Sequence, residues 1–254
     1  TMAVRMKEAM IFAAGLGTRL RPLTDNLPKA LVPVGGKPML EHVILRLKAA
    51  GFAHIVINVH HFGQKIIDFL EEHKNFGVAV DISDERDALL DTGGGIRKAA
   101  GYFRKGSPVL IHNVDIWSDA DLAGLYEGHG RSRVAASLWV SKRSTSRYLL
   151  FDEGHRLCGW ENTKTGEVKS PFPGFSPSAY EPYAFGGIHV ISPALLERMQ
   201  DWGEKFSIID FYLSVAGEAI IQACPASAGA LWMDLGKPEA LTAAENYLKS
   251  AGHE

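Results

Sequence analysis

The segment IFAAGLGTRLRPLTDNLPKALVPV, residues 11 to 34, contains residue types suited to binding a polyphosphate. Its apolar start ends at Gly15 and Gly17, and Arg19 and Lys29 follow within one loop-sized stretch. Glycines let a backbone approach a ligand closely, consecutive amides cradle phosphate oxygens, and cations add charge-assisted hydrogen bonds. The segment lacks the GK[ST] of a P-loop and the third glycine of GxGxxG. It predicts an anion-binding loop of another type; a glycine turn beside solvated cations is the alternative.

Two aspartates stand where apolar strands are expected to end, and they suit a hard divalent cation. Asp115 follows VLIHNV, and Asp234 follows ALWM far along the chain. Mg²⁺ takes one or two protein carboxylates and completes its octahedron with substrate phosphates and water. Helices are expected after both positions, so on spacing alone a pair of helix N-caps is an equal alternative.

The stretch LLDTGGGIRKA places Thr92 and three glycines, at 93 to 95, before an expected helix. Exposed amides without side-chain bulk are a good seat for a flat base or a ribose. Because the stretch has no charged anchor, a glycine-rich loop that merely starts a helix is the alternative.

The elements that position these residues alternate between strands and helices. Apolar or β-branched runs predict strands at 9–15, 54–60, 78–84, 107–115 and 133–141. Amphipathic segments predict helices at 38–51, 63–73, 93–103 and 119–128, the last capped by Ser118. The predicted fold class is α/β: a Rossmann-like mixed, mainly parallel sheet flanked by helices, with ligands outside the carboxyl ends of the strands.

The alternation changes at residues 142–182, which contain the strand candidates YLLF and RLCGW and the proline-rich SPFPGFSPSAYEP. A long connection of this kind is usually functional or mobile. A strand at 183–192, two helices, a last strand at 230–235 and a helix from Pro238 are expected to follow. We therefore predict one domain over residues 1–254, with an acceptor-side insertion at 142–182.

Composition argues against several classes of protein. The net charge of −2 gives no support for a nucleic-acid-binding surface, and no apolar run of about 18 residues predicts a membrane span. Cys158 and Cys224 are far apart and lack CxxC spacing, so neither a disulfide framework nor a zinc site is expected. A reducing cytoplasm is the simplest location.

Together these residues resemble the signature of the sugar-1-phosphate nucleotidyltransferases, the enzymes that make nucleotide sugars. The run GxGTRxxPxT is followed by PKxLxPV and GKPM, and LLDTGGGI, NVDIWSD, FGGIHVIS and WMDLGKPEAL occur in the family's order. The resemblance extends over roughly residues 8 to 250 and is nearest to the N-acetylmuramate-1-phosphate uridylyltransferase-like branch. It implies the nucleotide-diphospho-sugar transferase fold.

The resemblance implies an in-line attack by a sugar-1-phosphate oxygen on the α-phosphorus of a nucleoside triphosphate, UTP for this branch, with Mg²⁺ as cofactor. It implies that Arg19 contacts the leaving pyrophosphate, that Lys29 neutralises charge at the α-phosphate, and that Asp115 and Asp234 bind Mg²⁺. The residues implied for the nucleotide are Ala14, Gly15, Gly17, Thr18, Gly94, Gly95 and Asn113. Those implied for the sugar phosphate are Glu161, Lys164 and Gly187.

The chain departs from the family pattern mainly on the acceptor side. Val114 stands where relatives have the glycine of NGD, and WENTKTG keeps Glu161 but has no lysine in register, which leaves Lys164 as the candidate. Two alternatives therefore stay open: a GTP-using mannose- or heptose-1-phosphate guanylyltransferase, and a relative that binds nucleotide without turnover. The sequence does not name the sugar, because specificity is expected within 142–182, where the pattern is weakest.

Overall fold

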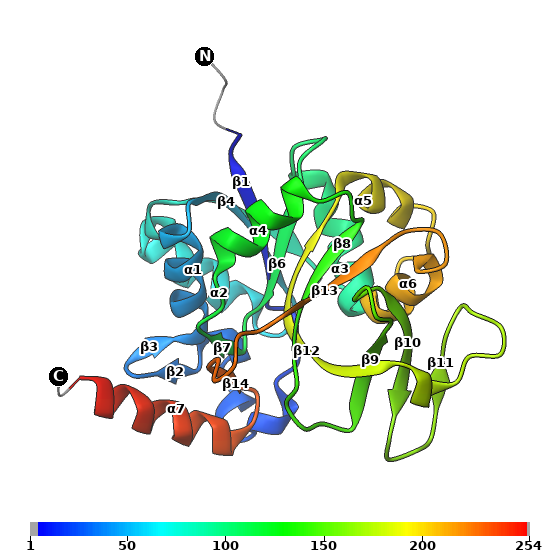
Figure 1. Ribbon diagram of the computed structural model, residues 1–254. Coiled ribbons are helices and arrows are strands. Elements are labelled where there is room, and N and C mark those ends of the chain that lie inside the picture. Colours follow the sequence, from blue (N-terminus) through cyan, green and yellow to red (C-terminus); the bar gives the residue numbers. More distant parts are fainter. Residues whose placement is uncertain (1–4, 253–254) are drawn as a thin grey trace. The chain divides into compact units, whose positions relative to one another are not determined.

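The computed structural model describes residues 5–252 (Figure 1). Strands and helices mostly alternate up to Arg131, and five strands then follow one another between Ala136 and Ile191 without an α-helix between them. By their internal contacts these residues divide into two compact units. The first contains residues 5–89, 112–120 and 230–252, and the second contains Leu90–Ile111 and Asp121–Gly229. None of the helices within residues 5–252 has the length and apolar character needed to cross a membrane.

The first unit is built on short parallel strands. They are β1 (Lys7–Phe12), β4 (Phe52–Val59) and β5 (Ala79–Asp84), in the order β1–β4–β5. Parallel strands need crossover connections, and helices α1 (Met39–Ala49) and α2 (Gly63–Glu72) lie between them in the chain. Met10, Ile11, Ile55 and Val56 are completely buried, which explains why these strands read as continuous apolar runs.

The first unit also contains several short elements and one longer helix. The chain leaves β1 through single-turn helices at Thr18–Leu20, Leu23–Asp25 and Lys29–Leu31, and then forms a hairpin of β2 (Pro33–Val34) and β3 (Lys37–Pro38). Later segments add an antiparallel ribbon of β7 (Ile116–Ser118) and β14 (Trp232–Asp234), and helix α7 (Pro238–Ala251). A further helical turn spans Lys74–Gly77.

The second unit combines a mixed sheet with four helices. Its strands are β8 (Ala136–Ser141), β9 (Arg147–Phe151), β10 (Leu157–Asn162), β11 (Val168–Lys169), β12 (Glu181–Ile191) and β13 (Ile221–Pro225). Antiparallel pairing gives the order β11–β10–β9–β12–β8, and β13 joins β8 in parallel. The helices are α3 (Asp91–Ala99), α4 (Leu122–Arg131), α5 (Pro193–Met199) and α6 (Ile208–Val215), with single turns at Ala100–Tyr102 and Pro177–Ala179.

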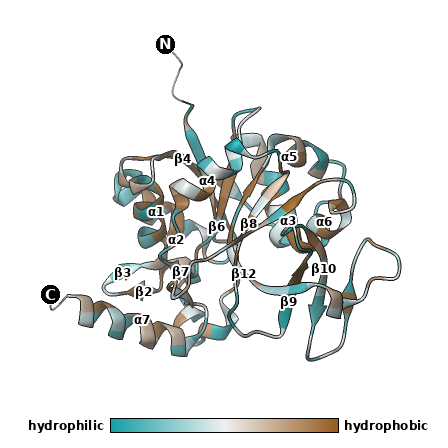
Figure 2. Cartoon of the chain, viewed as in Figure 1, coloured by the Kyte–Doolittle hydropathy of each residue, from teal (hydrophilic) through white to brown (hydrophobic). Residues whose placement is uncertain are grey.

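Hydrophobic residues concentrate on the strands, as Figure 2 shows, whereas α1 and α7 mix teal and brown along their length. In α1 the buried residues are Met39, Leu40, Val43, Ile44 and Leu47, which share one helical face. The amphipathic spacing that predicts a helix over 38–51 is therefore the spacing of the buried residues of α1.

Residues 142–182, the predicted insertion, form β9, β10, β11 and a helical turn in the second unit. The two strand candidates YLLF and RLCGW are confirmed as parts of β9 and β10. Phe175 lies directly over Gly159 of β10, where a Cβ would be 2.3 Å from its ring. The organisation as one domain with an insertion stays a prediction.

The structure corrects several boundaries and one cap: the strand predicted over 9–15 is β1 at Lys7–Phe12, and the helix predicted over 119–128 is α4 at Leu122–Arg131. The strand expected over 107–115 is β6 (Val109–Asn113), and β7 starts three residues after its end. Helix α3 begins at Asp91, so the glycines at 93 to 95 lie in its first turn. Ser118 does not cap α4, because β7 extends through Ser118 to pair with β14; the cap is Asp121, whose Oδ1 accepts a hydrogen bond from the Gly124 amide at 2.9 Å.

Candidate active site

The first part of the site is the glycine loop, residues 14–18, which follows β1. Gly17 has φ 66° and ψ 29°, in the left-handed region that favours glycine. A Cβ at Gly17 would also lie 2.9 Å from Cγ2 of Thr24, whose hydroxyl donates to the Gly17 carbonyl at 2.7 Å. Within residues 5–252 the amides of residues 14–18 donate no hydrogen bond, and residues 15–18 are at least partly exposed, so the amides of residues 15–18 can donate to an anion.

Two cations and two carboxylates meet beside this loop in the first unit. Lys29 Nζ donates to Asp115 Oδ2 at 2.9 Å, and Arg19 Nη1 donates to Asp234 Oδ2 at 3.0 Å. Arg19 Nη2 lies 3.9 Å from Asp115 Oδ2, so Arg19 connects the two acids. The Arg19 side chain is 51% exposed and that of Lys29 is 15% exposed. The four formal charges cancel.

The ribbon of β7 and β14 explains how acids so distant in sequence converge. Asp234 pairs with Ile116, the residue after Asp115, and the Leu235 amide donates to the Asp115 carbonyl at 2.7 Å. The alternative reading as helix N-caps is wrong for both acids. Asp115 precedes a strand, and the N-cap of α7 is Lys237.

Gly236 is a residue of the site whose importance the sequence reasoning missed. A Cβ at this position would lie 2.4 Å from Arg19 Nη2 and 2.9 Å from both Asp115 Oδ2 and Asp234 Oδ1. Its amide donates to Asp234 Oδ1 at 2.9 Å. A side chain at this position would therefore displace the ends of Arg19, Asp115 and Asp234, and the only sequence signal was its position two residues after a candidate metal ligand.

The donor set fits a magnesium ion. The same Cβ position is 2.9 Å from one oxygen of each carboxylate, so these two oxygens are no further apart than twice that distance. The described residues contain no group of three or more His, Cys, Asp and Glu side chains that could hold a metal. Two carboxylates agree with Mg²⁺, which takes its remaining ligands from phosphates and water.

His112 lies on β6, three residues before Asp115, and is completely buried. Burial lowers its pKa to about 4, so its imidazole is neutral at neutral pH. Its Nδ1–H donates to the carbonyl of Asn113, the last residue of β6, at 2.7 Å. Asn113 is one of the residues predicted to bind the nucleotide. Two others in the first unit are Ala14, which is completely buried, and Thr18, which begins a helical turn.

The glycines predicted to hold the base lie in the second unit, and packing accounts for two of the three. A Cβ at Gly93 would lie 2.3 Å from the Phe206 ring, and one at Gly94 would lie 2.1 Å from the Glu204 carbonyl oxygen. The amides of Gly93 and Gly94 both donate to the Phe206 carbonyl, at 2.8 and 3.2 Å. A role of Gly94 and Gly95 in base binding stays a prediction.

The predicted acceptor residues also lie in the second unit. Glu161 is in β10 and faces Tyr148 of β9 across the pair. Lys164 lies in the exposed turn after β10, where its amide donates to Asn162 Oδ1. Gly187 has φ 77° at the point where the register of β12 with β8 shifts. A second lysine, Lys169 of β11, places Nζ 4.8 Å from the ring centroid of Trp160, but it also contacts Asp210 at 3.2 Å.

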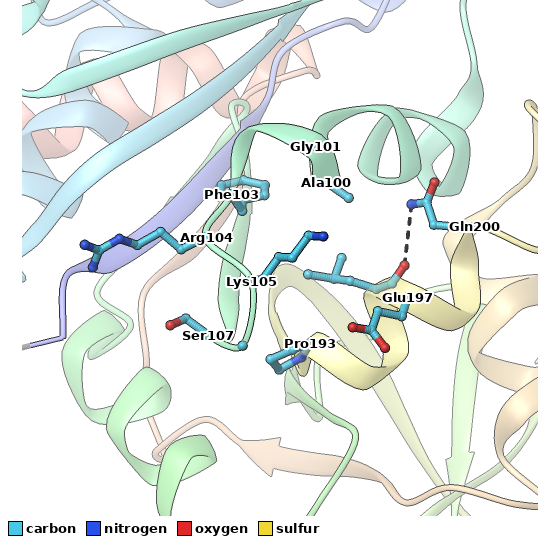
Figure 3. Close-up of a pocket in the computed structure, with 11 residues that line it drawn as sticks. Ala100, Gly101, Phe103, Arg104, Lys105, Ser107, Pro193, Glu197 and Gln200 are labelled. Carbon is cyan, nitrogen blue, oxygen red and sulfur yellow. Dashed lines mark hydrogen bonds between the residues drawn. The ribbon is translucent and has the colours of Figure 1, made fainter.

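A cavity of about 330 Å³ in the second unit contains none of the predicted site residues (Figure 3). It lies between the segment from Ala100 to Ser107 and helix α5, with Phe103 and Leu196 as apolar lining and Lys105 and Glu197 as charged lining. Gln200 Nε2 donates to the Leu196 carbonyl at 3.5 Å.

The chain belongs to the nucleotidyl transferase family, whose model matches residues 8–148. This match covers the glycine loop, both cations and Asp115, and it confirms the resemblance to the sugar-1-phosphate nucleotidyltransferases. The class of enzyme that the fold and the site define is thus a transferase of nucleotidyl groups.

Of three curated relatives, one matches nearly the whole chain and two match about half of it. An N-acetylmuramate α-1-phosphate uridylyltransferase of Caulobacter vibrioides is 34% identical over 98% of this chain and 100% of its own length. A second protein of that name, from Neisseria meningitidis, is 40% identical over 52% of this chain and 58% of its own. A mannose-1-phosphate guanylyltransferase of Mycobacterium tuberculosis is 34% identical over 54% of this chain and 38% of its own.

Solved structures share the fold. A UDP-glucose pyrophosphorylase complexed with UDP-glucose has a TM-score of 0.76 at 16% identity and covers 97% of this chain and 99% of its own. HddC from Yersinia pseudotuberculosis, complexed with GMP-PN, has a TM-score of 0.73 at 22% identity and covers 96% of this chain and all of its own. The predicted fold class, a mixed, mainly parallel sheet flanked by helices, is confirmed.

Proposed function

We propose that this enzyme transfers a uridylyl group from UTP to N-acetylmuramate-1-phosphate and releases pyrophosphate, with Mg²⁺ as cofactor. One observation carries the proposal. Lys29 Nζ bonds Asp115 and also lies 3.0 Å from the position of a Cβ on Gly15, so cations, acids and the glycine loop form one cluster. Such a cluster can bind a nucleoside triphosphate and neutralise the charge that develops when its α-phosphorus is attacked.

In the proposed mechanism the glycine loop holds the triphosphate through its amides, with Gly15, Gly17 and Thr18 closest to the phosphates. Arg19 is placed on the β- and γ-phosphates, and its guanidinium stabilises the pyrophosphate that leaves. Lys29 neutralises charge that develops on the α-phosphate oxygens. Mg²⁺, held by Asp115 and Asp234, would supply charge neutralisation at the phosphates.

The chemical step forms a bond from the sugar-phosphate oxygen to the α-phosphorus and breaks the bond from that phosphorus to the β-phosphate oxygen. A phosphate monoester has its second pKa near about 6, so the attacking oxygen is already largely deprotonated at neutral pH. No side chain has to act as a general base. Catalysis then consists of positioning and charge neutralisation.

The proposed choice of substrates is supported by the Caulobacter vibrioides relative, which matches along its whole length. We assign Ala14, Gly94, Gly95 and Asn113 to the nucleoside. We assign Glu161, Lys164 and Gly187 to the sugar phosphate. The cytoplasmic location and the absence of nucleic-acid and membrane partners stay predictions.

A guanylyltransferase is the second candidate. The Mycobacterium tuberculosis relative supports it, although that match covers about half of this chain. A relative that binds nucleotide without turnover is the third, but such a protein would not need both Asp115 and Asp234 next to two cations.

The test is pyrophosphate release with each of UTP, GTP, ATP, CTP and dTTP, Mg²⁺ and a panel of sugar-1-phosphates. We expect the fastest release with UTP and N-acetylmuramate-1-phosphate, and background release from Asp115→Asn. Faster turnover with GTP and mannose- or heptose-1-phosphate would identify the second candidate. Tight UTP binding with equal inactivity of the wild type and Asp115→Asn would identify the third.

A further inference from the structure

Two chains of hydrogen-bonded polar groups, here called relays, cross the same three strands of the first unit. One lies near the amino ends of the strands and the other near their carboxyl ends. In the amino-end relay, His54 of β4 bonds Glu8 of β1 at 2.5 Å and Asp81 of β5 at 2.7 Å. In the carboxyl-end relay, Asn58 of β4 accepts from the Ala13 amide at 2.7 Å and donates to Glu85 Oε2 at 2.6 Å. Each relay has its central residue on β4.

The carboxyl-end relay is buried and fixed at its far end. Asn58 is 0% exposed and Glu85 is 1% exposed. The Glu85 amide donates to the Val59 carbonyl at 2.8 Å, and the Glu85 carbonyl accepts from His60 Nδ1 at 2.6 Å. Because the Glu85 backbone is held on both sides, its carboxylate is a fixed acceptor that sets the orientation of the Asn58 carboxamide.

The near end of this relay lies where the chain leaves the sheet. Phe12 is the last residue of β1, and its carbonyl still accepts from the Val114 amide at 3.1 Å. The next amide, that of Ala13, donates to the Asn58 side chain instead of a strand neighbour. The glycine loop starts at the following residue. Its entry is therefore fixed by Asn58, and its exit by the hydrogen bond from Thr24 to Gly17.

We propose that Asn58 and Glu85 are positioning residues for nucleotide binding: they fix the direction in which the glycine loop leaves β1 and so preorganise its free amides for phosphates. The inference rests on the proposed function, in which that loop holds the triphosphate. A loop that is ordered before binding loses less conformational entropy when the ligand arrives, so the relay contributes to nucleotide affinity. It makes no contact with the acceptor sugar in this assignment.

The amino-end relay supplies a matched control. His54→Ala removes the central residue of the amino-end relay and takes one hydrogen-bond partner from the buried Glu8. Asn58→Ala does the same in the carboxyl-end relay for the buried Glu85. Both changes are expected to lower the melting temperature. Only the change at Asn58 affects the start of the glycine loop.

The experiment measures KM for UTP, KM for the sugar-1-phosphate, and the dissociation constant of UTP by calorimetry. For Asn58→Ala and Glu85→Ala we expect KM and the dissociation constant for UTP to rise about tenfold, which corresponds to about 1.4 kcal/mol. KM for the sugar-1-phosphate should change less than about twofold. Glu85→Gln retains an acceptor for Asn58 and should restore the wild-type UTP values, and His54→Ala should keep them despite its lower stability.

Unchanged UTP affinity in Asn58→Ala, or the same loss in His54→Ala, overturns the positioning role. So does failure of both Asn58→Ala and Glu85→Ala to fold while His54→Ala folds, because the relay would then be structural. If only one of Asn58→Ala and Glu85→Ala fails to fold, the UTP affinity of the other variant is compared with that of Glu85→Gln. A wild type without turnover contradicts the proposed function instead, and calorimetry with UTP then still tests the relay.

Discussion

Gly236→Ala adds a single methyl group at the point where the two acids and Arg19 meet. The new Cβ would lie 2.9 Å from Asp115 Oδ2 and from Asp234 Oδ1, closer than a carbon and an oxygen pack without a shift. Arg19, with half of its side chain exposed, moves away at low cost. The carboxylates are held by Lys29 and by the residue 236 amide, so they must separate or rotate.

The expected cost follows from this displacement. A catalytic constellation has to be held within about 0.5 Å of its working geometry, and a misplacement of about 1 Å costs on the order of 10² in rate. Magnesium tolerates distorted octahedra poorly. We therefore expect kcat/KM to fall by about 10- to 100-fold, or about 1.4 to 2.7 kcal/mol in activation free energy, with a higher Mg²⁺ concentration at half-maximal rate.

The assay is pyrophosphate release at increasing Mg²⁺ with saturating substrates, together with thermal unfolding. Gly128→Ala in α4 is the matched control, because a Cβ there meets nothing within 4 Å. It should keep wild-type activity. Wild-type kcat/KM and an unchanged Mg²⁺ midpoint in Gly236→Ala would refute the reasoning that the two acids share an ion at this point.

Three further predictions concern charge and protonation. Lys29→Met should lower kcat by about 10² to 10³, the usual cost of one preorganised donor at developing charge, and wild-type turnover would contradict its role. Asp234→Asn should lose Mg²⁺-dependent turnover but fold normally, because the N-cap position of α7 is Lys237 and not Asp234; an unfolded protein would indicate a structural role instead. Burial lowers the pKa of His129 to about 4 and that of His189 to about 3, below the unfolded value of 6.5. The unfolded chain therefore binds more protons between pH 6.5 and 4, and each histidine should reduce the free energy of unfolding by about 1.4 kcal/mol per pH unit as the pH falls through that range. Urea titrations at pH 7, 6 and 5 measure this slope, and an equal slope in His189→Phe would contradict it.

Much of the candidate site follows from local sequence patterns. Gly15, Gly17, Arg19 and Lys29 lie within one short segment, and the apolar run before them ends where β1 ends, within a few residues. The amphipathic spacing of α1 and the β-branched run of β4 likewise give the elements to within a few residues. Periodicity and turn chemistry are properties of neighbouring residues, so a single sequence carries them.

Tertiary structure decided which distant groups meet. The contact between Asp234 and Arg19, and the sharing of Arg19 with Asp115, depend on the pairing of β7 with β14, which no local pattern encodes. The same holds for Asn58, an amide inside an apolar strand whose partner Glu85 lies 27 residues away. Spacing also misassigned the cap of α4 to Ser118, because the strand pairing that occupies Ser118 is set by a segment more than a hundred residues later.

The sequence by itself thus determined the class of fold, the position of the glycine loop after the first strand and the identities of the charged groups beside it. Only the folded chain decided that both acids contact Arg19, that a Cβ on Gly236 would meet all three of these side chains, and that Asn58 accepts a hydrogen bond from the residue before the loop. The physical reason is that residue type and periodicity act over a few residues, whereas convergence depends on strand pairing and side-chain packing across the whole unit.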